Sequence, residues 1–443
     1  MTLVPKPPSS ARSAMGILAT RVVVFPISVA VGILVARALG PSDRGVYAFM
    51  CLFNGFWLPI GSFGFGASIT YFTSSRKFAA SEIILSCVAV GLLQGASIGL
   101  LAAGAWWLGL LGVIGEQLEP RLLVPVLLLL PLQGAEGLLM RLIIGASWFR
   151  VFNIITFSTP LLLAVFLSTF VLWFDWGLTG AVTSFVLANL LVCALTFGAA
   201  VFRFRPSRMF DLQFLREGFA YGTKAWIGDL AVRANMRFDQ FVLGISAEPA
   251  MLGMYTVAVN IGELLLWIPD SLAMVLFNRL AAQKTTAERA RLIGQVHRVL
   301  FFLILLMAMV IGAVAGPLIV VLYGEKFAGA VWPFVILLPG TVMVVTTKVI
   351  TKYFGASGMP GRSSLVQVVG MILGVLLYII LIPILGISGA AIGHSVAFVT
   401  TAIVAAVLYA RDIKPEKTGL FSLTRDDLKW GSQQVRNALG RTR

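Results

Sequence analysis

The sequence contains little charge for its size. Of its 443 residues only 12% are charged and 58% are hydrophobic, and the mean hydropathy is +0.93. About a quarter of the residues of an ordinary globular protein are charged. A soluble chain could not bury this much apolar surface, so the composition excludes a soluble globular protein. Apolar stretches near the ~20 residues that cross a bilayer recur along the chain and predict an all-α integral membrane protein.

Cysteine and histidine are also scarce. Cys51, Cys87 and Cys193 lie in apolar stretches without paired or metal-type spacing, so no disulfide framework is implied. His297 and His394 are isolated, and we expect an ordinary packing or loop role for each. No constellation of acid, base and nucleophile stands on the predicted outer loops. We therefore expect no enzyme, no catalytic residue, no metal site and no cofactor.

Twelve membrane-crossing helices are expected. Their approximate ranges are 13–37, 45–73, 80–112, 121–145, 151–174, 178–202, 218–245, 250–278, 298–323, 328–353, 363–385 and 388–410. Most of the 34 Lys and Arg residues fall in alternate loops and in both tails. By the positive-inside rule this places both termini in the cytoplasm. The rule also accounts for the net charge of +15, so the lipid bilayer, and not nucleic acid, is the expected partner.

Short Gly- and Pro-containing phrases of the first half recur in the second half at nearly constant spacing. Pro41, Gly45 and Tyr47 are matched by Pro249, Gly253 and Tyr255. Because Gly and Pro punctuate helix ends, the chain is predicted to contain two halves with the same order of helices. Six spans, an even number, separate equivalent helices, so the repeat is parallel. We expect two six-helix bundles around a central cleft, as in transporters.

The expected domain organisation follows from these spans. Between the bundles, Pro206 ends one helix and apolar residues then alternate with charged ones, which predicts a short in-plane amphipathic helix. In the basic C-terminal tail, Thr424 to Asp427 resemble a capping box. The predicted parts are a cytoplasmic tail at 1–12, a bundle at 13–205, an amphipathic cytoplasmic linker at 206–217, a bundle at 218–410 and a basic cytoplasmic tail at 411–443.

Charged side chains inside the predicted spans are concentrated in one helix. Such residues are costly in a bilayer and usually face a bundle interior or an aqueous cavity. The span at 218–245 contains Lys224, Asp229, Arg233, Arg237 and Asp239. Asp229, Arg233 and Arg237 are four residues apart and share one helical face. Two interpretations stay open: a structural ladder of ion pairs, or a cleft lining that attracts an anionic substrate and offers a carboxylate for coupling.

Seven residues are candidates for the transport site. We predict substrate binding by Arg21, Lys224, Arg233 and Arg237, and coupling or gating by Asp229, Asp239 and Glu263. Glu263 is either a site for a coupling ion, H⁺ or Na⁺, or the partner of an Arg on the neighbouring helix. The repeat places Arg21 at the position equivalent to Asp229, so the two could pair across the cleft. These assignments remain expectations from spacing and charge.

Three further charges lie near helix ends or beside a proline. Asp270 follows Pro269, where a carboxylate can satisfy a backbone group that proline leaves open. Arg141 and Lys348 lie near predicted cytoplasmic helix ends. Each of these two either extends to the lipid headgroups or contacts substrate.

The order of several motifs resembles a known family. Residues 36–41, followed by Gly45-Val46-Tyr47 and Gly64-Phe65-Gly66, resemble the first two helices of bacterial polysaccharide transporters. Arg237-Phe238-Asp239 and Gly253-Met254-Tyr255 match the second half in the same way. In this order the motifs resemble the O-antigen and exopolysaccharide flippases of the multidrug/oligosaccharidyl-lipid/polysaccharide (MOP) exporter superfamily.

The resemblance implies a fold, a substrate and a location. It implies two bundles that form a V-shaped cavity in the bacterial inner membrane. A lipid-linked oligosaccharide would be flipped there from the cytoplasmic to the outer leaflet for cell-surface polysaccharide synthesis. Glycosyltransferases and a polysaccharide polymerase are the implied partners. Flippases of the peptidoglycan precursor commonly have two additional helices, which are not predicted here, so that substrate is disfavoured.

Two other functions remain as alternatives. A cation-coupled multidrug exporter could share the fold, but a small cationic drug favours an acidic cavity. A polyprenyl pyrophosphate is anionic, and Arg and Lys can neutralise it through charge-assisted hydrogen bonds. A membrane polysaccharide polymerase or ligase would be expected to have a large outer loop, whereas the predicted outer loops are short.

Overall fold

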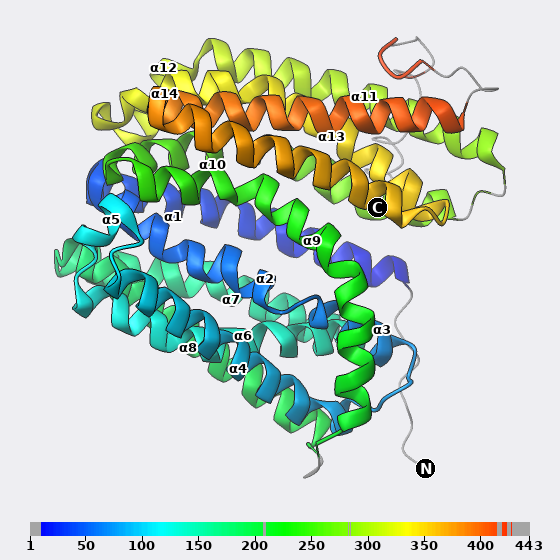
Figure 1. Cartoon of the computed structure of the whole chain (residues 1–443), viewed down its shortest axis with the longest axis horizontal. Helices are drawn as coiled ribbons and strands as arrows, with labels where there is room; N and C mark the ends of the chain where they lie inside the picture. Colours follow the sequence, from blue (N-terminus) through cyan, green and yellow to red (C-terminus); the bar gives the residue numbers. More distant parts are fainter. Residues whose placement is uncertain are drawn as a thin grey trace, which may run out of the picture. The chain divides into compact units, whose positions relative to one another are not determined.

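The computed structural model describes residues 10–206, 210–281, 283, 285–413, 419–422 and 427. Within these ranges it leaves the side chains of residues 10–23, 225, 271, 273–275, 277, 278 and 281 undescribed. The described chain is helical apart from short turns (Figure 1). Its elements are α1 (Ser10–Leu52), η1 (Phe53–Trp57), α2 (Leu58–Gly61), α3 (Phe65–Ser74), α4 (Ala80–Trp107), α5 (Gly112–Gln117), α6 (Pro120–Gly145), α7 (Phe149–Leu167), η2 (Ser168–Trp173), α8 (Gly177–Phe204), α9 (Leu212–Ser246), α10 (Pro249–Ala281), α11 (Thr286–Ala313), α12 (Ala315–Tyr323), η3 (Glu325–Ala330), α13 (Val331–Ala356) and α14 (Pro360–Asp412).

The described helices agree with the expected number of crossings. Nine spans in the described part of the chain are long and apolar enough to cross a membrane. The helices α1 and α14 each bend at a glycine with positive φ, Gly40 at 73° and Gly386 at 54°, a conformation that glycine adopts without steric cost. Each therefore provides two crossings. With the 35-residue α9, which is not among the nine, these helices give the twelve crossings predicted from the sequence.

Large apolar side chains on the outside support the membrane assignment. Leu100 is 75% exposed, Trp107 80% and Trp173 84%. Scattered apolar residues occur on any protein surface, but long helices that are apolar on their outer face indicate lipid contact. The protein is therefore a multi-pass membrane protein, as predicted.

The chain divides into two compact units. The first unit comprises Met1–Arg233 and Gly244–Gly253, and the second comprises Ala234–Leu243 and Met254–Arg443. The division falls within α9, beyond the linker expected at 206–217. The division lies there because the first half of α9 packs on the first unit. Trp226 Nε1, for example, donates a hydrogen bond of 2.8 Å to the Ile60 carbonyl oxygen.

The beginning of α9 also packs into the core of the first unit. Residues 212–217 form its first turns and are not a separate in-plane helix. Phe214 is fully buried in a cluster with Phe65, Phe72 and Phe78. The apolar side of the alternating segment therefore packs against protein.

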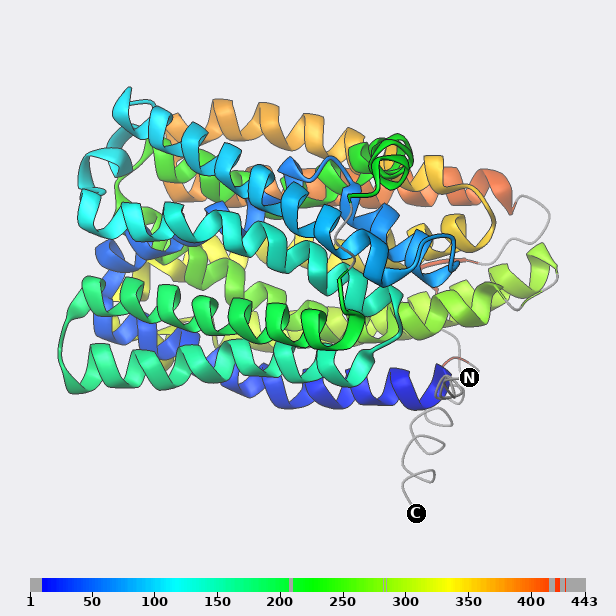
Figure 2. The ribbon, with the colours of Figure 1, turned by 90° about the horizontal axis from the view of Figure 1, so that it is seen from below.

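Small residues allow close helix packing in the first unit. The helices α4 and α6 lie side by side (Figure 1). A Cβ atom added at Gly91 would lie 2.3 Å from the Ala135 Cα, and one at Gly95 would lie 2.1 Å from the Leu130 carbonyl oxygen. Close backbone approach through small residues is typical of membrane helix pairs, where the lipid offers no hydrophobic driving force. The helices α7 and α8 form a second antiparallel pair (Figure 2).

The repeated phrases contact one another within the first unit. A Cβ atom at Gly45 would lie 1.8 Å from the Pro249 carbonyl oxygen, and one at Gly253 would lie 1.9 Å from the Pro41 carbonyl oxygen. These two contacts are reciprocal, because each glycine meets the proline of the other phrase. The repeat therefore preserves glycines where two helix ends meet backbone to backbone.

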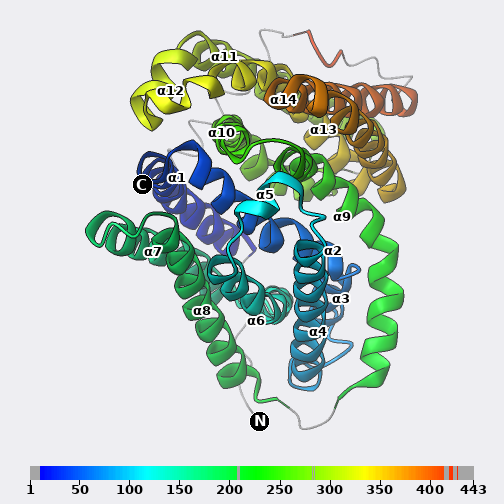
Figure 3. The same cartoon turned by 60° about the vertical axis from the view of Figure 1, so that its left-hand side comes forward.

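In the second unit, α14 packs along α13 (Figure 3), and a piece of the C-terminal segment docks on α11. Arg298 forms a two-pronged ion pair with Asp427, with both N···O distances at 2.7 Å. His297 Nδ1 lies 2.9 Å from the Leu420 carbonyl oxygen, and its Nε2 lies 2.8 Å from the Thr346 hydroxyl. His297 thus has the packing role that we expected. Most of the predicted capping box, 424–426, lies outside the described residues.

Candidate functional site

A polar cavity of about 170 Å³ opens in the first unit. We call it the first-unit cavity. Its walls come from the segment between α1 and α3, from the start of α3, and from α4, α6 and α9. The lining residues are Asn54, Leu58, Pro59, Ser62, Gly64, Gly66, Ala67, Gln94, Gln133, Gly134, Glu136, Gly137, Leu138, Arg141, Asp229 and Arg233.

Two guanidinium groups line this cavity. Arg141 near the end of α6 is exposed, and Arg233 on α9 is half-buried. The charge of Arg233 interacts with those of Asp229 and Arg141. Neither arginine forms an ion pair within 4 Å in the part of the chain that the structure describes. Their donors are therefore available to a ligand, and guanidinium groups bind carboxylates and phosphates in a bidentate manner.

Two glutamines add unsatisfied hydrogen-bonding groups. Gln133 is only 5% exposed, and neither its amide nitrogen nor its oxygen has a partner among the described atoms. Gln94 donates to the Leu58 carbonyl, but its own amide oxygen has no described partner. A buried polar group without a partner costs about 1–3 kcal/mol. Both side chains line the cavity, so a polar ligand there would satisfy them.

Two carboxyl groups complete the polar lining. Glu136 on α6 accepts a hydrogen bond of 3.4 Å from the Thr196 hydroxyl. Asp229 on α9 is exposed and lies one turn before Arg233. The cavity therefore combines cationic donors and amide groups, which suit a polar anionic ligand, with two carboxyl groups.

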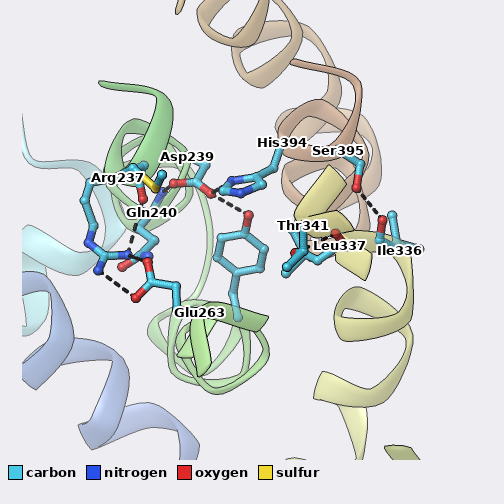
Figure 4. Close-up of polar contacts among 11 residues, drawn as sticks. Arg237, Asp239, Gln240, Glu263, Ile336, Leu337, Thr341, His394 and Ser395 are labelled. Atoms are coloured by element: carbon cyan, nitrogen blue, oxygen red, sulfur yellow. Dashed lines mark hydrogen bonds and ion pairs between the residues drawn. The ribbon is translucent and has the colours of Figure 1, made fainter. Parts of the chain in front are cut away.

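The second unit has a different polar arrangement. Arg237 binds Glu263 in a bidentate ion pair, Nη1 to Oε1 at 2.5 Å and Nη2 to Oε2 at 3.0 Å (Figure 4). Asp239 Oδ2 accepts a hydrogen bond of 2.6 Å from the Tyr255 hydroxyl and lies 2.7 Å from His394 Nδ1. Asp239 and Tyr255 are fully buried and His394 is 5% exposed.

Comparisons with known proteins agree with this architecture. The profile of the family described as "Polysaccharide biosynthesis protein" matches residues 34–332, more than half of the chain. The chain belongs to this polysaccharide biosynthesis protein family. The resemblance seen in the sequence is confirmed. No curated protein matches the chain significantly.

Solved structures show the fold that this family member adopts. It is similar to a multidrug resistance MATE family transporter of the MOP superfamily in its inward-facing conformation, with 15% identity, a TM-score of 0.69, and coverage of 88% of this chain and 94% of that one. A MOP superfamily transporter from Pyrococcus furiosus gives 16% identity, a TM-score of 0.62 and coverage of 92% and 96%. A MATE transporter from Vibrio cholerae gives 16%, 0.55, and 92% and 95%. At these identities the likeness shows the fold alone, which is that of MOP transporters.

Only some of the predicted site residues line the first-unit cavity. Arg233 and Asp229 lie at the first-unit cavity, whereas Lys224 is exposed on α9 outside its lining. The side chain of Arg21 lies outside the described part of the structure, and so does its expected pairing with Asp229. Of the four residues predicted to bind substrate, Arg233 is the one that lies in the described lining of the cavity.

The other predicted residues lie in the second unit. Arg237 and Glu263 pair with each other, so Glu263 is the partner of a neighbouring Arg, one of the two interpretations that the sequence left open. Asp239 lies in the buried contact with His394. Lys348 pairs with Asp270, which gives Asp270 a partner other than the backbone beside Pro269.

Sequence reasoning missed several residues of the family member's polar sites. For Arg141 the sequence leaves both headgroups and substrate open, and the structure places it in the lining of the first-unit cavity. Gln94 and Gln133 are uncharged, so charge inside the spans does not reveal them. His394 is isolated in the sequence, because its partner Asp239 is 155 positions away. Its place in an apolar helix was the available signal, since a polar aromatic group there needs a buried partner.

Proposed function

We propose that the protein is a flippase for a lipid-linked oligosaccharide on a polyprenyl pyrophosphate carrier. It moves the molecule from the cytoplasmic to the outer leaflet of a bacterial inner membrane, by ion-coupled alternating access with both termini in the cytoplasm. Family membership in polysaccharide biosynthesis and the MOP transporter fold support this proposal. The protein forms no covalent bond with its substrate. Glycosyltransferases supply the substrate and a polymerase consumes it.

The proposal rests on two arginines of a polar cavity that form no ion pair with any described residue. Arg141 and Arg233 offer bidentate donors to the pyrophosphate oxygens, and Asp229 moderates their charge. Hydrogen bonds to charged groups contribute about 1.5–3 kcal/mol each. Two such arginines can therefore distinguish a pyrophosphate head from a neutral lipid.

The rest of the substrate fits the same arrangement. Gln94 and Gln133 can donate to and accept from sugar hydroxyl groups with the amide atoms that have no described partner. The polyprenyl tail can stay in the bilayer, since apolar lipid gains nothing by leaving it. The acids at the cavity, Glu136 and Asp229, change charge on protonation and so can weaken or strengthen anion binding during the cycle.

A flipping assay tests the proposal. The purified protein is reconstituted in liposomes with a polyprenyl-pyrophosphate-linked oligosaccharide, and the fraction that becomes accessible to an external glycosidase is followed in time. We expect Arg233→Gln and Arg141→Gln each to slow flipping about tenfold or more, because about 1.4 kcal/mol corresponds to a factor of ten. The matched control is Arg150→Gln, which removes an exposed arginine outside the cavity lining and should leave the rate unchanged.

Three results would reject the proposal. One is equal rates for the wild type, Arg141→Gln and Arg233→Gln with all proteins equally folded. Another is transport of a cationic dye without flipping of the anionic lipid, which would identify a multidrug exporter. The third is formation of glycosidic bonds by the purified protein, which would identify a polymerase or ligase.

A further inference from the structure

A buried polar cluster in the second unit lies outside the lining of the first-unit cavity. We call it the Asp239 cluster; it comprises Asp239 of α9, Tyr255 of α10, and Tyr378 and His394 of α14. All four residues are at most 5% exposed. Burying a carboxyl and an imidazole in a membrane protein is costly, and such groups commonly mark ion or proton pathways.

The hydrogen bonds of the cluster converge on one oxygen atom. Asp239 Oδ2 accepts from the Tyr255 hydroxyl at 2.6 Å and lies 2.7 Å from His394 Nδ1. The other oxygen, Oδ1, accepts from the Gln240 backbone amide at 2.8 Å. The Tyr378 hydroxyl is buried without a hydrogen-bond partner among the described atoms, and it lies within electrostatic range of Asp239. The carboxyl group is therefore held in place from three helices.

The charges around Asp239 balance only when one proton is added. The facing groups are Arg237 of the same helix, Tyr255 and Glu263 of α10, and Tyr378 and His394 of α14, while α13 contributes the neutral Thr341 to the same region. Glu263 and Arg237 neutralise each other in their bidentate pair. The Asp239 carboxylate with a neutral imidazole leaves one negative charge buried. One proton shared by the Asp239–His394 pair removes this charge, and an unpaired buried charge is costly.

The donor atoms suit a proton better than a hard cation. Na⁺, like other hard cations, prefers a shell of oxygen atoms. At Asp239 the imidazole nitrogen occupies the position next to the carboxylate oxygen. A small cavity of about 10 Å³ lies beside the pair, lined by both Glu263 and His394. That volume is near the minimum for one water molecule. A single water molecule there can pass a proton to the pair, but a hydrated cation does not fit.

We propose that the Asp239–His394 pair binds the coupling proton of the transport cycle, with Tyr255 fixing the carboxylate by its hydrogen bond. In the loaded state the pair carries two protons, one between Oδ2 and Nδ1 and one on Nε2, and it is neutral overall. In the empty state the Nε2 proton has left to water, and the neutral imidazole donates its Nδ1 proton to the carboxylate. The assignment of the proton site does not depend on the identity of the substrate, whereas the coupling role rests on the proposed flippase function.

Infrared difference spectroscopy on the full-length protein in lipid nanodiscs tests the binding of the proton. Spectra recorded between acid and alkaline pH report carboxyl and imidazole protonation directly. We expect a carboxyl or imidazole band that corresponds to one titrating group per protein. This band should be absent in Asp239→Asn. His394→Gln should keep one titrating carboxyl but shift its pH midpoint, because the imidazole no longer shares the proton. The matched control, Glu325→Gln, removes an exposed acid of the second unit and should leave the signal in place.

Three spectroscopic outcomes overturn the proposal. One is a signal that persists unchanged in Asp239→Asn. If Asp239→Asn does not fold, a His394→Gln protein with the midpoint of the wild type overturns it. The third is a signal lost in Glu263→Gln but kept in Asp239→Asn, since the proton would then lie on the other acid.

A gradient experiment tests the coupling. In liposomes with an imposed pH difference, the wild type should flip the lipid-linked oligosaccharide several-fold faster than without it. Asp239→Asn should lose this acceleration but retain gradient-independent flipping. Acceleration that survives in Asp239→Asn would contradict the coupling role. If the wild type flips nothing while the spectroscopic signal is present, the flippase function fails and the proton site stands.

Discussion

The polar groups of the two units differ in one respect that indicates different roles. In the first unit, Arg141, Arg233 and Gln133 line an open cavity, and no described carboxylate forms an ion pair with the arginines. In the second unit, Arg237 and Asp239 already have partners within the fold. Polar side chains without described partners can bind a large external ligand. Polar side chains that are buried and already paired can stabilise the fold or bind a single proton. The same helix, α9, supplies groups to both arrangements.

The largest expected effect on stability concerns a buried ion pair of the second unit. Arg298 and Asp427 form a buried ion pair in the second unit, with side chains 11% and 1% exposed. Removing one partner leaves the other charge uncompensated, so Arg298→Met should lower the free energy of unfolding by about 3–5 kcal/mol. Thermal unfolding in detergent measures this. The double variant Arg298→Met/Asp427→Leu should recover most of the loss, and equal losses in single and double variants would refute the account of this pair.

A smaller effect of opposite sign is expected in the first unit. Gln133→Leu replaces a buried amide that lacks described partners with an apolar group of similar size. The protein should become more stable by about 1 kcal/mol, as measured by thermal unfolding, but flip its substrate more slowly. A variant that is less stable would show that Gln133 is satisfied within the fold, and the contrast between the units would weaken.

The smallest effect concerns an exposed pair of the first unit. Lys77 donates a hydrogen bond to Glu217, and this bond, with a second one from Gln213, lowers the pKa of the Glu217 carboxyl below its ordinary value of 4.5. A lowered pKa gives stability that is present above pH 4.5 and is lost as the pH falls through the lowered value. Glu217→Gln should remove this weak pH dependence from unfolding curves. Because the pair is solvated, the change at neutral pH should be near the detection limit.

Much of the fold could be predicted from the sequence, for a physical reason. Bilayer thickness fixes the length of each crossing and glycine marks the bends, so the expected division between 13–37 and 45–73 coincides with the kink at Gly40. The end of the linker was harder to predict. The alternation at 212–215 resembles a helix lying on lipid, but Phe214 instead packs into a core that includes Phe65, far away in sequence.

The candidate sites could be predicted only in part. Charge inside a span is visible in the sequence, which is why Arg233, Asp239 and Glu263 were found. Pairing is not visible, because Arg237 and Glu263 could be assigned to each other only with coordinates. Gln133 of the first-unit cavity and Tyr255 of the Asp239 cluster are uncharged, so the pattern of charges in the sequence does not reveal their roles.

Direct binding of the lipid head group tests the central claim, that the two units divide substrate binding and proton binding between them. Native mass spectrometry of the protein in nanodiscs can count bound polyprenyl pyrophosphate for the wild type, Arg141→Gln/Arg233→Gln and Asp239→Asn. We predict that the double arginine variant loses the bound lipid and that Asp239→Asn keeps it. Retention of the lipid by the arginine variant, or its loss only in Asp239→Asn, would contradict the division.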